Sequence, residues 1–429
     1  MKIALLGYGV EGESVYNYYH AKYPDAEFTA YDNKSEPKNS LPAGVEFVGN
    51  VQDFINIEAD IAVKTPAIAP WLVQVSGEVT TMTREFMKTC PAPIIGVTGT
   101  KGKGTTSSLI QSILQAAGKK TWLVGNIGVG AFDVLDQIQP EDIVVYELSS
   151  FQLWDCDVSP HIAVVLGIEP EHLDVHNGFE DYLSAKANIA SHQKQDDAVV
   201  YKASNEYAVA IAEQSSAQKV AYESDDHAHA TDGAFYYGEQ LLCSTDVLKI
   251  PGAHNIDNAC AAIDAAWQWV QDGDVIAKGL AAFEGLPHRL KFVRDVDGVG
   301  YYDDSIATTP GSAIAALAAF EQPKVLILGG SDKGADYDHL AAEIARSNIR
   351  HVFLIGSEAP RLQAAIDGTG VSDYTNLGSL VTMGEIVEAA AAKAQRGDVV
   401  ILSPACASFD MFKSYSDRGD KFIAAVQRL

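Results

Sequence analysis

The sequence predicts an α/β protein with parallel sheets, and three observations support this class. Apolar runs such as residues 94–97, 143–146 and 399–402 are continuous, which is typical of strands that helices cover on both faces of a sheet. Alanine-rich helical patterns such as Glu385 to Ala394 alternate with these runs, which indicates βαβ units. The chain of 429 residues also exceeds one core, since a domain takes roughly 150 residues. We therefore expect three domains, at residues 1–90, 91–286 and 287–429.

The first domain is predicted to be Rossmann-like. It opens with a strand-like run, Lys2–Leu6, and a G-x-G-x-x-G turn at residues 7–12 follows. A second strand-like run, residues 27–31, ends before Asp32. A glycine turn between a strand and a helix, with an acidic residue after the next strand, is typical of a dinucleotide site. The third domain has the same alternation of strands and helices and is also expected to be Rossmann-like.

Two connecting segments stand out by composition. The segment from Gly285 to Arg289 contains Gly-Leu-Pro, and we expect it to act as a hinge between the second and third domains. The polar segment at residues 225–233 is expected to be a surface loop.

The composition argues against several classes of protein. The formal net charge is −26, whereas a nucleic-acid partner needs clustered lysine and arginine. No apolar run reaches the ~18 residues of a membrane span, and the chain opens on a strand rather than a secretory signal. The cysteines are scattered and never spaced as C-x-x-C, which suits a reducing compartment. We expect a cytoplasmic monomer that binds neither nucleic acid nor a membrane.

The central domain begins with a predicted phosphate-binding loop, Gly96 to Thr106 (GVTGTKGKGTT). Its glycines free the turn from side-chain clashes, so that backbone N–H groups and the start of the next helix can face an anion. That helix is expected from Thr105 to Ala117. Lys103 is placed to reach the terminal phosphates of ATP, and Thr105 or Thr106 could offer a hydroxyl to Mg²⁺. The loop therefore predicts an ATP-using enzyme with a P-loop-type central domain.

Other polar residues leave more than one interpretation open. Glu147 ends a buried strand, where a carboxylate is costly unless it binds a cation, and Mg²⁺ is the obvious one. The H-x-D-x-H pattern at residues 172–176 could be a zinc cluster or a solvated loop. Asn255 and Asn258 share one face of a helix start, either as caps or as partners of a base. Lys333, in a glycine turn, could be a solvated charge.

The loop TGTKGK at residues 98–103 resembles the TGTNGK loop of the Mur ligase and folylpolyglutamate synthase superfamily, which joins an amine to a carboxylate with ATP. Further segments resemble that family in the family's order. They are GNIG at 125–128, YELSSFQ at 146–152, EHLDVH at 171–176, YLSAKANI at 182–189, GAHNIDNA at 252–259, FEGLPHR at 283–289, DDSIATTP at 303–310, GGSDKG at 329–334 and SPACASFD at 403–410.

The resemblance implies an ATP site, in which Lys103 and Arg289 stabilise the transferring phosphoryl group. The residues that it assigns to ATP are Gly99, Thr100, Lys101, Gly102, Lys103, Gly104, Thr105, Asn126, Asn255, Asn258, Arg289 and Asp304, the last for the ribose. It also implies two Mg²⁺ ions, and their ligands would be Thr105, Glu147, His172 and Lys186, with Lys186 carried as a carbamate. The family has Asn where this chain has Lys101 and often a hydroxyl residue where it has Gly104, so we assign the metal-binding hydroxyl to Thr105.

The last two segments, GGSDKG and SPACASFD, are most typical of the branch that adds glutamate to UDP-N-acetylmuramoyl-L-alanine. In that branch the first domain binds the UDP moiety rather than a nicotinamide cofactor. The implied UDP-substrate residues are Gly9, Val10, Glu11, Asp32, Asn33, Lys34, Asn126 and Ser149. The implied amino-acid pocket consists of Thr308, Lys333, Ser408, Phe409 and Tyr415. Ile306 and Thr309 depart from the family pattern in this pocket, so D-glutamate, L-glutamate and another amino acid all stay open.

The resemblance therefore implies a ligase of peptidoglycan precursor synthesis that works through an acyl phosphate, with the third domain closing to exclude water. Three alternatives remain within reach of the sequence. The chain could be an L-glutamate-adding or folylpolyglutamate synthase-like ligase, a nucleotide-gated binding protein that has lost ligation, or a nicotinamide-dependent oxidoreductase that uses residues 7–12.

Overall fold

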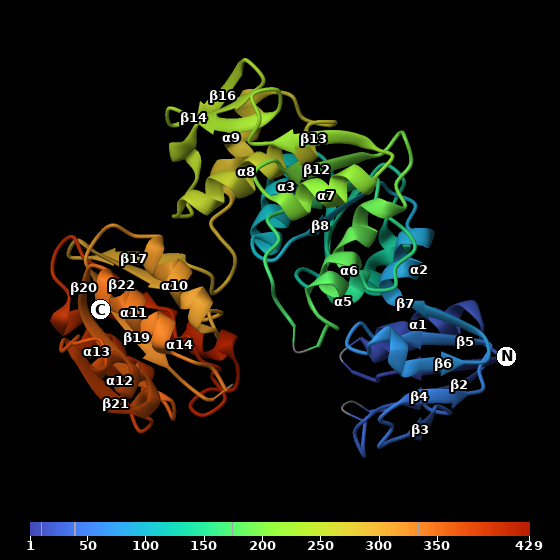
Figure 1. The fold of residues 1–429 in the computed structure, drawn as a ribbon, viewed down its shortest axis with the longest axis horizontal. Coiled ribbons are helices and arrows are strands. Elements are labelled where there is room, and N and C mark those ends of the chain that lie inside the picture. Colours follow the sequence, from blue (N-terminus) through green and yellow to red (C-terminus); the bar gives the residue numbers. More distant parts are fainter. Residues whose placement is uncertain (10, 38–39, 174, 333) are drawn as a thin grey trace. The chain divides into compact units, whose positions relative to one another are not determined.

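The computed structural model describes residues 1–9, 11–37, 40–173, 175–332 and 334–429 (Figure 1). Its contacts separate two compact units, which are residues 1–247 with 256–282, and residues 248–255 with 283–429. The first unit contains two parallel sheets, and the boundary that we predict near residue 90 falls between them. None of the helices in the described part of the chain combines the length and the apolar character that a membrane span requires.

The amino-terminal sheet has the strand order β3-β2-β1-β5-β7, and adjacent strands run parallel. Its strands are β1 (Lys2–Leu6), β2 (Glu27–Tyr31), β3 (Glu46–Val48), β5 (Ile61–Lys64) and β7 (Glu78–Thr81). The predicted bounds of β1 and β2 are confirmed. One face packs on α1 (Gly12–Lys22) and α2 (Met82–Thr89), and the other packs in part on the pair β4 (Phe54–Ile57) and β6 (Val73–Val75).

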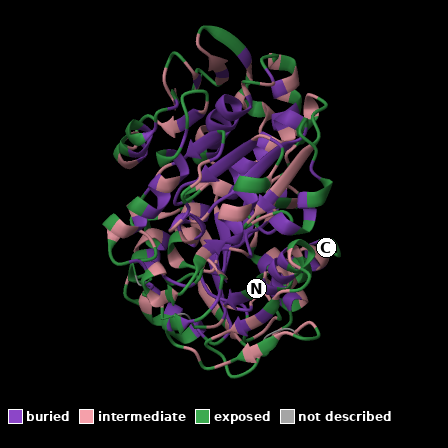
Figure 2. Cartoon of the chain, turned by 90° about the vertical axis from the view of Figure 1, so that its right-hand side faces the viewer, coloured by how far each residue is buried: buried purple, intermediate pink, exposed green. Residues whose placement is uncertain are grey.

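The central sheet has the order β13-β12-β11-β8-β10-β9, again with parallel neighbours. Its strands are β8 (Ile94–Thr98), β9 (Thr121–Gly125), β10 (Ile143–Glu147), β11 (Ile162–Val165), β12 (Ala198–Lys202) and β13 (Gln218–Tyr222). Its helices are α3 (Lys103–Ala116), α4 (Ala131–Val134), α5 (Ser150–Leu153), α6 (Phe179–Ser191), α7 (Glu206–Gln214), α8 (Ala253–Ala266) and α9 (Gly273–Ala282). The chain leaves β8 towards β9 and later leaves β11 towards β12 in the opposite direction, so right-handed crossovers put α3 and α6 on opposite faces. The buried residues accordingly follow the strands (Figure 2).

The expectation of a surface loop at residues 225–233 is wrong. Four of these residues form β14 (Ala228–Thr231), which pairs antiparallel with β15 (Ala234–Tyr237), and β15 pairs with β16 (Gln240–Ser244). Ala228 is buried and its N–H donates to the Asp264 carboxylate over 3.0 Å. The polar composition hid this strand because only its first side chain is buried.

Asp264 is expected to make the stability of the central fold depend on pH. One of its carboxylate oxygens is buried and makes no hydrogen bond within the described ranges, and burial raises the pKa of Asp264 to about 7. An aspartate in an unfolded chain has a pKa of ~3.9, so the folded state holds a proton that the unfolded state releases. Stability from this group is therefore lost as the pH rises from about 4 to about 7.

The variant Asp264→Asn removes the titrating group. We expect its free energy of unfolding, relative to that of the unchanged chain, to rise by about 2 kcal/mol between acidic and mildly alkaline buffer. Urea unfolding at both pH values measures this difference. A difference that does not change with pH would contradict the prediction.

The second unit holds a mixed sheet of order β17-β18-β22-β19-β20-β21, antiparallel only between β17 and β18 among its described pairs. Its strands are β17 (Lys291–Val296), β18 (Val299–Asp303), β19 (Lys324–Gly329), β20 (Ile349–Ile355), β21 (Tyr374–Gly378) and β22 (Val399–Leu402). One face packs on α10 (Pro310–Ala318), α11 (Asp338–Arg346) and α12 (Ala359–Asp367), and the other on α13 (Met383–Lys393) and α14 (Tyr415–Val426).

Candidate functional site

The predicted phosphate loop lies between β8 and α3. The helix begins at Lys103, two residues before the predicted start, because Gly102 adopts a left-handed conformation (φ +87°) and begins the turn there. A Cβ atom on Gly102 would lie 2.4 Å from the Asn258 Oδ1, and one on Gly99 would lie 2.6 Å from the Leu166 Cβ. Both positions therefore require glycine. The loop brings the amino end of α3 to the end of a buried strand, as an anion site needs.

Lys103 lies over this loop. Its Nζ donates to the carbonyl oxygens of Gly99 and Thr100, over 3.0 and 2.9 Å. The next two predicted loop residues contact the segment after β11, since the Thr100 hydroxyl donates to the Glu169 carbonyl over 3.0 Å and Lys101 pairs with the exposed Glu169 carboxylate at 3.6 Å. The side chain of Thr100 thus holds the loop in place.

The two threonines in the first turn of α3 differ in their contacts. The Thr106 hydroxyl is fully buried and donates to the Asn258 Oδ1 over 3.3 Å. The Thr105 hydroxyl makes no hydrogen bond within the part of the chain that the structure describes. This difference favours Thr105 as a metal-binding hydroxyl.

Glu147 lies at the same edge of the sheet. It is the last residue of β10 and stands opposite Val97 of β8 in register, while Thr98 stands opposite Val165 of β11. The carboxyl ends of the parallel strands lie at one edge of the sheet. From β8 the chain continues to β9 on one side of that strand, and it later reaches β11 on the other side, so the strand order reverses at β8. That switch point is where doubly wound sheets bind ligands. The fold therefore places the buried Glu147 beside the phosphate loop.

Lys186 reaches the same loop from α6. Its side chain is 1% exposed, and its Nζ donates to the Gly99 carbonyl over 2.8 Å and to the Thr98 hydroxyl over 3.3 Å. Burial, with a smaller effect from the Lys103 charge, holds the pKa of Lys186 well below its usual range. Two lysines that are 83 residues apart in sequence (103 and 186) thus donate to one carbonyl oxygen, that of Gly99.

The two histidines of the H-x-D-x-H pattern lie in different surroundings, and Asp174 between them is outside the described residues. The His172 side chain is exposed, lies 5.1 Å from the Phe151 ring between centroids, and pairs with Glu171 at 3.8 Å. His176 is buried, and its two ring nitrogens contact Asp181 at 3.1 Å and Ser150 at 3.0 Å. Within the described ranges no three of His, Cys, Asp and Glu gather as a metal site. A zinc cluster is therefore not supported by the described residues.

The Ser150–His176–Asp181 chain was missed by the sequence reasoning. Asp181 also accepts the Trp154 indole N–H over 3.0 Å, so the network holds α5 against α6. Ser149, predicted to contact the UDP substrate, caps α5 and pairs reciprocally with Gln152. The spacing of Ser150, His176 and Asp181 in the sequence does not predict these hydrogen bonds, because the turn between them brings the side chains together.

The three asparagines that are predicted to bind ATP make their contacts in different segments of the chain. Asn258 is buried under Gly102, as described above, and the Asn255 side chain donates to the Pro251 carbonyl over 2.6 Å. Asn126 follows β9 with an exposed side chain, and its N–H donates to the Glu147 carbonyl over 3.4 Å.

In the amino-terminal sheet, Asp32 joins two predicted UDP-binding segments. One carboxylate oxygen accepts the Tyr8 N–H over 2.9 Å and the other accepts the Lys34 N–H over 3.1 Å. Asn33 and Lys34 have exposed side chains. Burial, and then the Asp133 charge, raise the pKa of Glu11. Gly9 lies in the turn before α1, and Val10 is outside the described residues.

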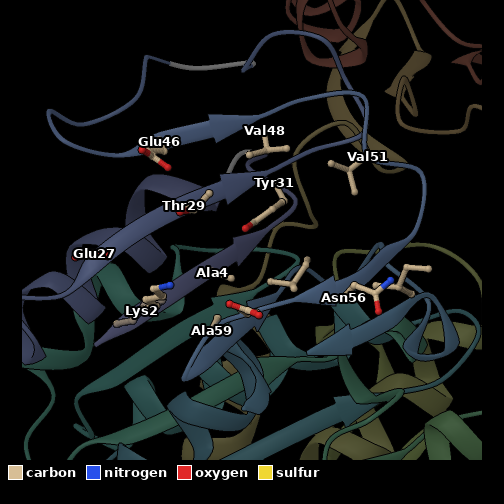
Figure 3. A pocket seen from close by; sticks show the side chains of 14 residues that line it. Lys2, Ala4, Glu27, Thr29, Tyr31, Glu46, Val48, Val51, Asn56 and Ala59 are labelled. Atoms are coloured by element: carbon tan, nitrogen blue, oxygen red, sulfur yellow. The ribbon is translucent and has the colours of Figure 1, made fainter. Parts of the chain in front are cut away.

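A hollow of about 530 Å³ lies on the open face of the same sheet (Figure 3). Alternate residues of β1 and β2, such as Lys2, Ala4, Thr29 and Tyr31, line it. The described lining residues include none of those predicted to bind a substrate. The predicted UDP residues instead lie in the turns after β1 and β2.

In the second unit, Asp304 is buried just after β18. Its carboxylate accepts the Leu290 N–H over 3.1 Å and the Ser403 hydroxyl over 2.7 Å. Burial raises the pKa of Asp304 to about 7, against the smaller lowering effect of the exposed Arg289. The structure thus brings together Asp304 and Arg289, which are both predicted to contact ATP.

The predicted amino-acid pocket draws on three segments of this unit. Ser408 is buried in the loop after β22, and the next residue, Phe409, is 73% exposed and donates its N–H to the Ser331 hydroxyl over 3.2 Å. Thr308 is half-buried before α10, and Tyr415 begins α14. Lys333 lies outside the described residues.

Two family models match the chain. The model described as the Mur ligase middle domain matches residues 97–266, and the one described as the Mur ligase, glutamate ligase domain matches residues 288–406. The chain is 36% identical over 461 residues to a UDP-N-acetylmuramoylalanine--D-glutamate ligase of Acetivibrio thermocellus, covering 100% of this chain and 96% of that protein. A protein of the same name from Streptococcus thermophilus is 36% identical over 413 residues, covering 93% of this chain and 90% of that protein.

Solved structures show the same fold. A UDP-N-acetylmuramate-alanine ligase from Thermotoga maritima aligns with a TM-score of 0.61 at 19% identity, covering 100% of this chain and 99% of that one. A Mycobacterium tuberculosis folylpolyglutamate synthase complexed with ADP aligns with a TM-score of 0.57 at 16% identity, covering 76% of this chain and 91% of that one.

The fold and these matches define an ATP-dependent ligase that joins a carboxylate to an amine in peptidoglycan synthesis. The chain belongs to the Mur ligase family. Enzymes of this family are ATP-dependent and generally require Mg²⁺. The predicted α/β class and the predicted family are therefore confirmed, and the roles of individual site residues stay predictions.

Proposed function

We propose that this chain adds D-glutamate to UDP-N-acetylmuramoylalanine as a monomer in the cytoplasm. A carboxylate oxygen of the alanine attacks the γ-phosphorus of ATP, and the bond from that phosphorus to ADP breaks. The glutamate amine then attacks the carbon of the acyl phosphate, phosphate leaves and the amine loses a proton. Full-length similarity to ligases of that name supports the choice of substrates.

The observation that carries the proposal is the convergence of Lys103 and Lys186 on the Gly99 carbonyl, beside Glu147 at the end of β10. The Lys103 cation at this loop stabilises the charge that spreads over the phosphoryl oxygens during transfer. Arg289 remains a predicted ligand of the γ-phosphate, and Asp304 a predicted ligand of the ribose. Mg²⁺ supplies further neutralisation of the phosphates when it is bound.

The described donors fit Mg²⁺ better than a metal that needs a full protein cage. Mg²⁺ keeps several waters and uses one or two carboxylates plus substrate phosphates, so a single buried Glu147 with the Thr105 hydroxyl is sufficient for one ion. We assign the second ion to His172 and to a carbamate on Lys186. The lowered pKa of Lys186 supports the carbamate, since only the neutral amine reacts with CO₂.

Phosphate release from ATP tests the proposal. With UDP-N-acetylmuramoyl-L-alanine present, we expect release at a rate at least about 100-fold higher with D-glutamate than with L-glutamate, because only one isomer directs both its amine and its carboxylates correctly. D-alanine is the matched control, since it lacks the side-chain carboxylate. Phosphate release with L-glutamate but not with D-glutamate would show that the enzyme adds the L isomer. No release with either isomer would refute the proposed substrates.

A further inference from the structure

Arg418 is the largest fully buried side chain in the described part of the chain, and no substrate role is assigned to it. It lies in the first turn of α14 and is 0% exposed. A guanidinium group is rarely buried in full unless its donors are satisfied. Its partners therefore show what it does.

The guanidinium donates to the loops that follow three neighbouring strands. Its Nε and Nη2 donate to the hydroxyl and carbonyl of Ser305, after β18, over 2.9 and 2.8 Å. Both Nη atoms donate to the Cys406 carbonyl, after β22, over 3.2 and 3.1 Å, and Nη1 also donates to the Ala407 carbonyl over 3.2 Å. A longer contact of 3.5 Å reaches the Gly329 carbonyl at the end of β19.

These loops carry the predicted amino-acid pocket. Thr308 lies three residues after Ser305, and Ser408 and Phe409 follow Ala407 directly. The Ser305 hydroxyl also donates to the Tyr415 carbonyl over 2.8 Å, which ties the start of α14 to the same group. Since β18, β22 and β19 are adjacent, one guanidinium fixes their carboxyl ends relative to one another.

The charge of Arg418 is not neutralised by contact. Its described partners are carbonyl and hydroxyl oxygens, and none of the described carboxylates forms an ion pair with it. Asp303 and Asp410 are the carboxylates that act electrostatically on Arg418, but each has another partner. Asp303 pairs with His288 at 2.7 Å, and Asp410 accepts the Ser357 N–H over 2.8 Å. Burial lowers the pKa of Arg418 to about 10, so the group remains a cation at neutral pH.

We propose that Arg418 is a positioning residue for the amino-acid pocket and that its unpaired charge favours an amino acid with an anionic side chain. Planar donors in a fixed fork hold three loops at once, which a lysine cannot do. A desolvated cation behind the loops lowers the energy of a dicarboxylate in front of them. This inference rests on the proposed function, because that function places the amino acid at these loops.

Two substitutions separate the fork from the charge. Arg418→Lys keeps the charge and loses donors, whereas Arg418→Met loses both. We expect the KM for D-glutamate to rise about tenfold in Arg418→Lys and about 100-fold in Arg418→Met, with the KM for ATP changed less than about twofold. Lys421→Met is the matched control, because it removes an exposed cation from the same helix and is expected to leave both KM values unchanged.

Equal changes in the KM for ATP and for D-glutamate would reduce Arg418 to a structural role and overturn the proposal. Equal rises of the KM for D-glutamate in Arg418→Lys and Arg418→Met would overturn the proposal that the charge of Arg418 favours an anionic side chain. If either variant fails to fold, Ser305→Ala removes one acceptor of the fork, and we expect it to raise the KM for D-glutamate about threefold.

Amide hydrogen exchange of the loops tests the positioning role of Arg418 without depending on the proposed substrates. In Arg418→Lys the amides of residues 329–331 and 405–409 are expected to exchange faster than in the unchanged chain, whatever the substrate. Unaltered exchange would overturn the positioning role. Faster exchange in a chain that releases no phosphate with D-glutamate would refute the substrates and leave the positioning role supported.

Discussion

Lys103→Met is expected to lower the rate of phosphate release about 10³-fold while leaving the fold intact. The Lys103 ammonium sits over the phosphate loop on the carbonyls of Gly99 and Thr100, where no other described cation except Lys186 contacts the loop carbonyls. Removing a cation that stabilises a transferring phosphoryl group costs about 10²–10³-fold or more in rate. A steady-state assay with both substrates and ATP measures the loss.

Lys119→Met is the matched control, because Lys119 is exposed just beyond the other end of α3. It is expected to keep the full rate. Thermal unfolding of both variants shows whether the fold is kept. A loss of less than about fivefold in Lys103→Met, with the fold intact, would show that the loop does not hold the reacting phosphate.

Lys186→Met is expected to lower the rate of phosphate release about 10²-fold or more, and Lys186→Arg is expected to do the same. Methionine fills the buried space but cannot bind a metal, and a guanidinium does not form a carbamate under these conditions. If Lys186 acted only through its positive charge, Lys186→Arg would keep most of the rate. Equal losses of rate in the two variants therefore favour the carbamate over the charge. ATP binding is expected to persist in both variants, because Lys103 remains.

The same proposal predicts a dependence on CO₂. Rigorous removal of CO₂ from the unchanged chain is expected to lower its rate, and added bicarbonate is expected to restore it, because the neutral Lys186 amine takes up CO₂ reversibly. Lys194→Met, at an exposed lysine beyond the end of α6, is the control. A full rate in Lys186→Arg would contradict the carbamate.

The sequence predicted those parts of the fold that depend on local patterns. The bounds of β1 and β2 follow from strand-like runs that end before Gly7 and before Asp32, and the phosphate loop follows from a strand, four glycines and an amphipathic helix. Glu147 was identified because a carboxylate at the end of a buried strand is conspicuous in any sequence. The start of α3 was placed two residues late, since the left-handed conformation of Gly102 is not visible in the composition.

The tertiary structure alone decided which side chains meet across distant segments. The choice of Thr105 over Thr106 depends on Asn258, which lies 152 residues beyond Thr106. The two lysines meet at Gly99 because α6 crosses the sheet beside β8, and the Arg418 fork joins loops whose strands are neighbours only after folding.

The physical reason for this division is one of distance along the chain. Periodicity and glycine placement act within a few residues, so the sequence by itself determined the α/β class, the family and the phosphate loop. Hydrogen bonds between buried groups depend on packing of segments that are 80 or more residues apart, as between Lys186 and Gly99 and between Arg418 and Ser305. Only the folded chain could decide that Lys186 shares a carbonyl with Lys103, and that one buried guanidinium binds three loops around the predicted amino-acid pocket.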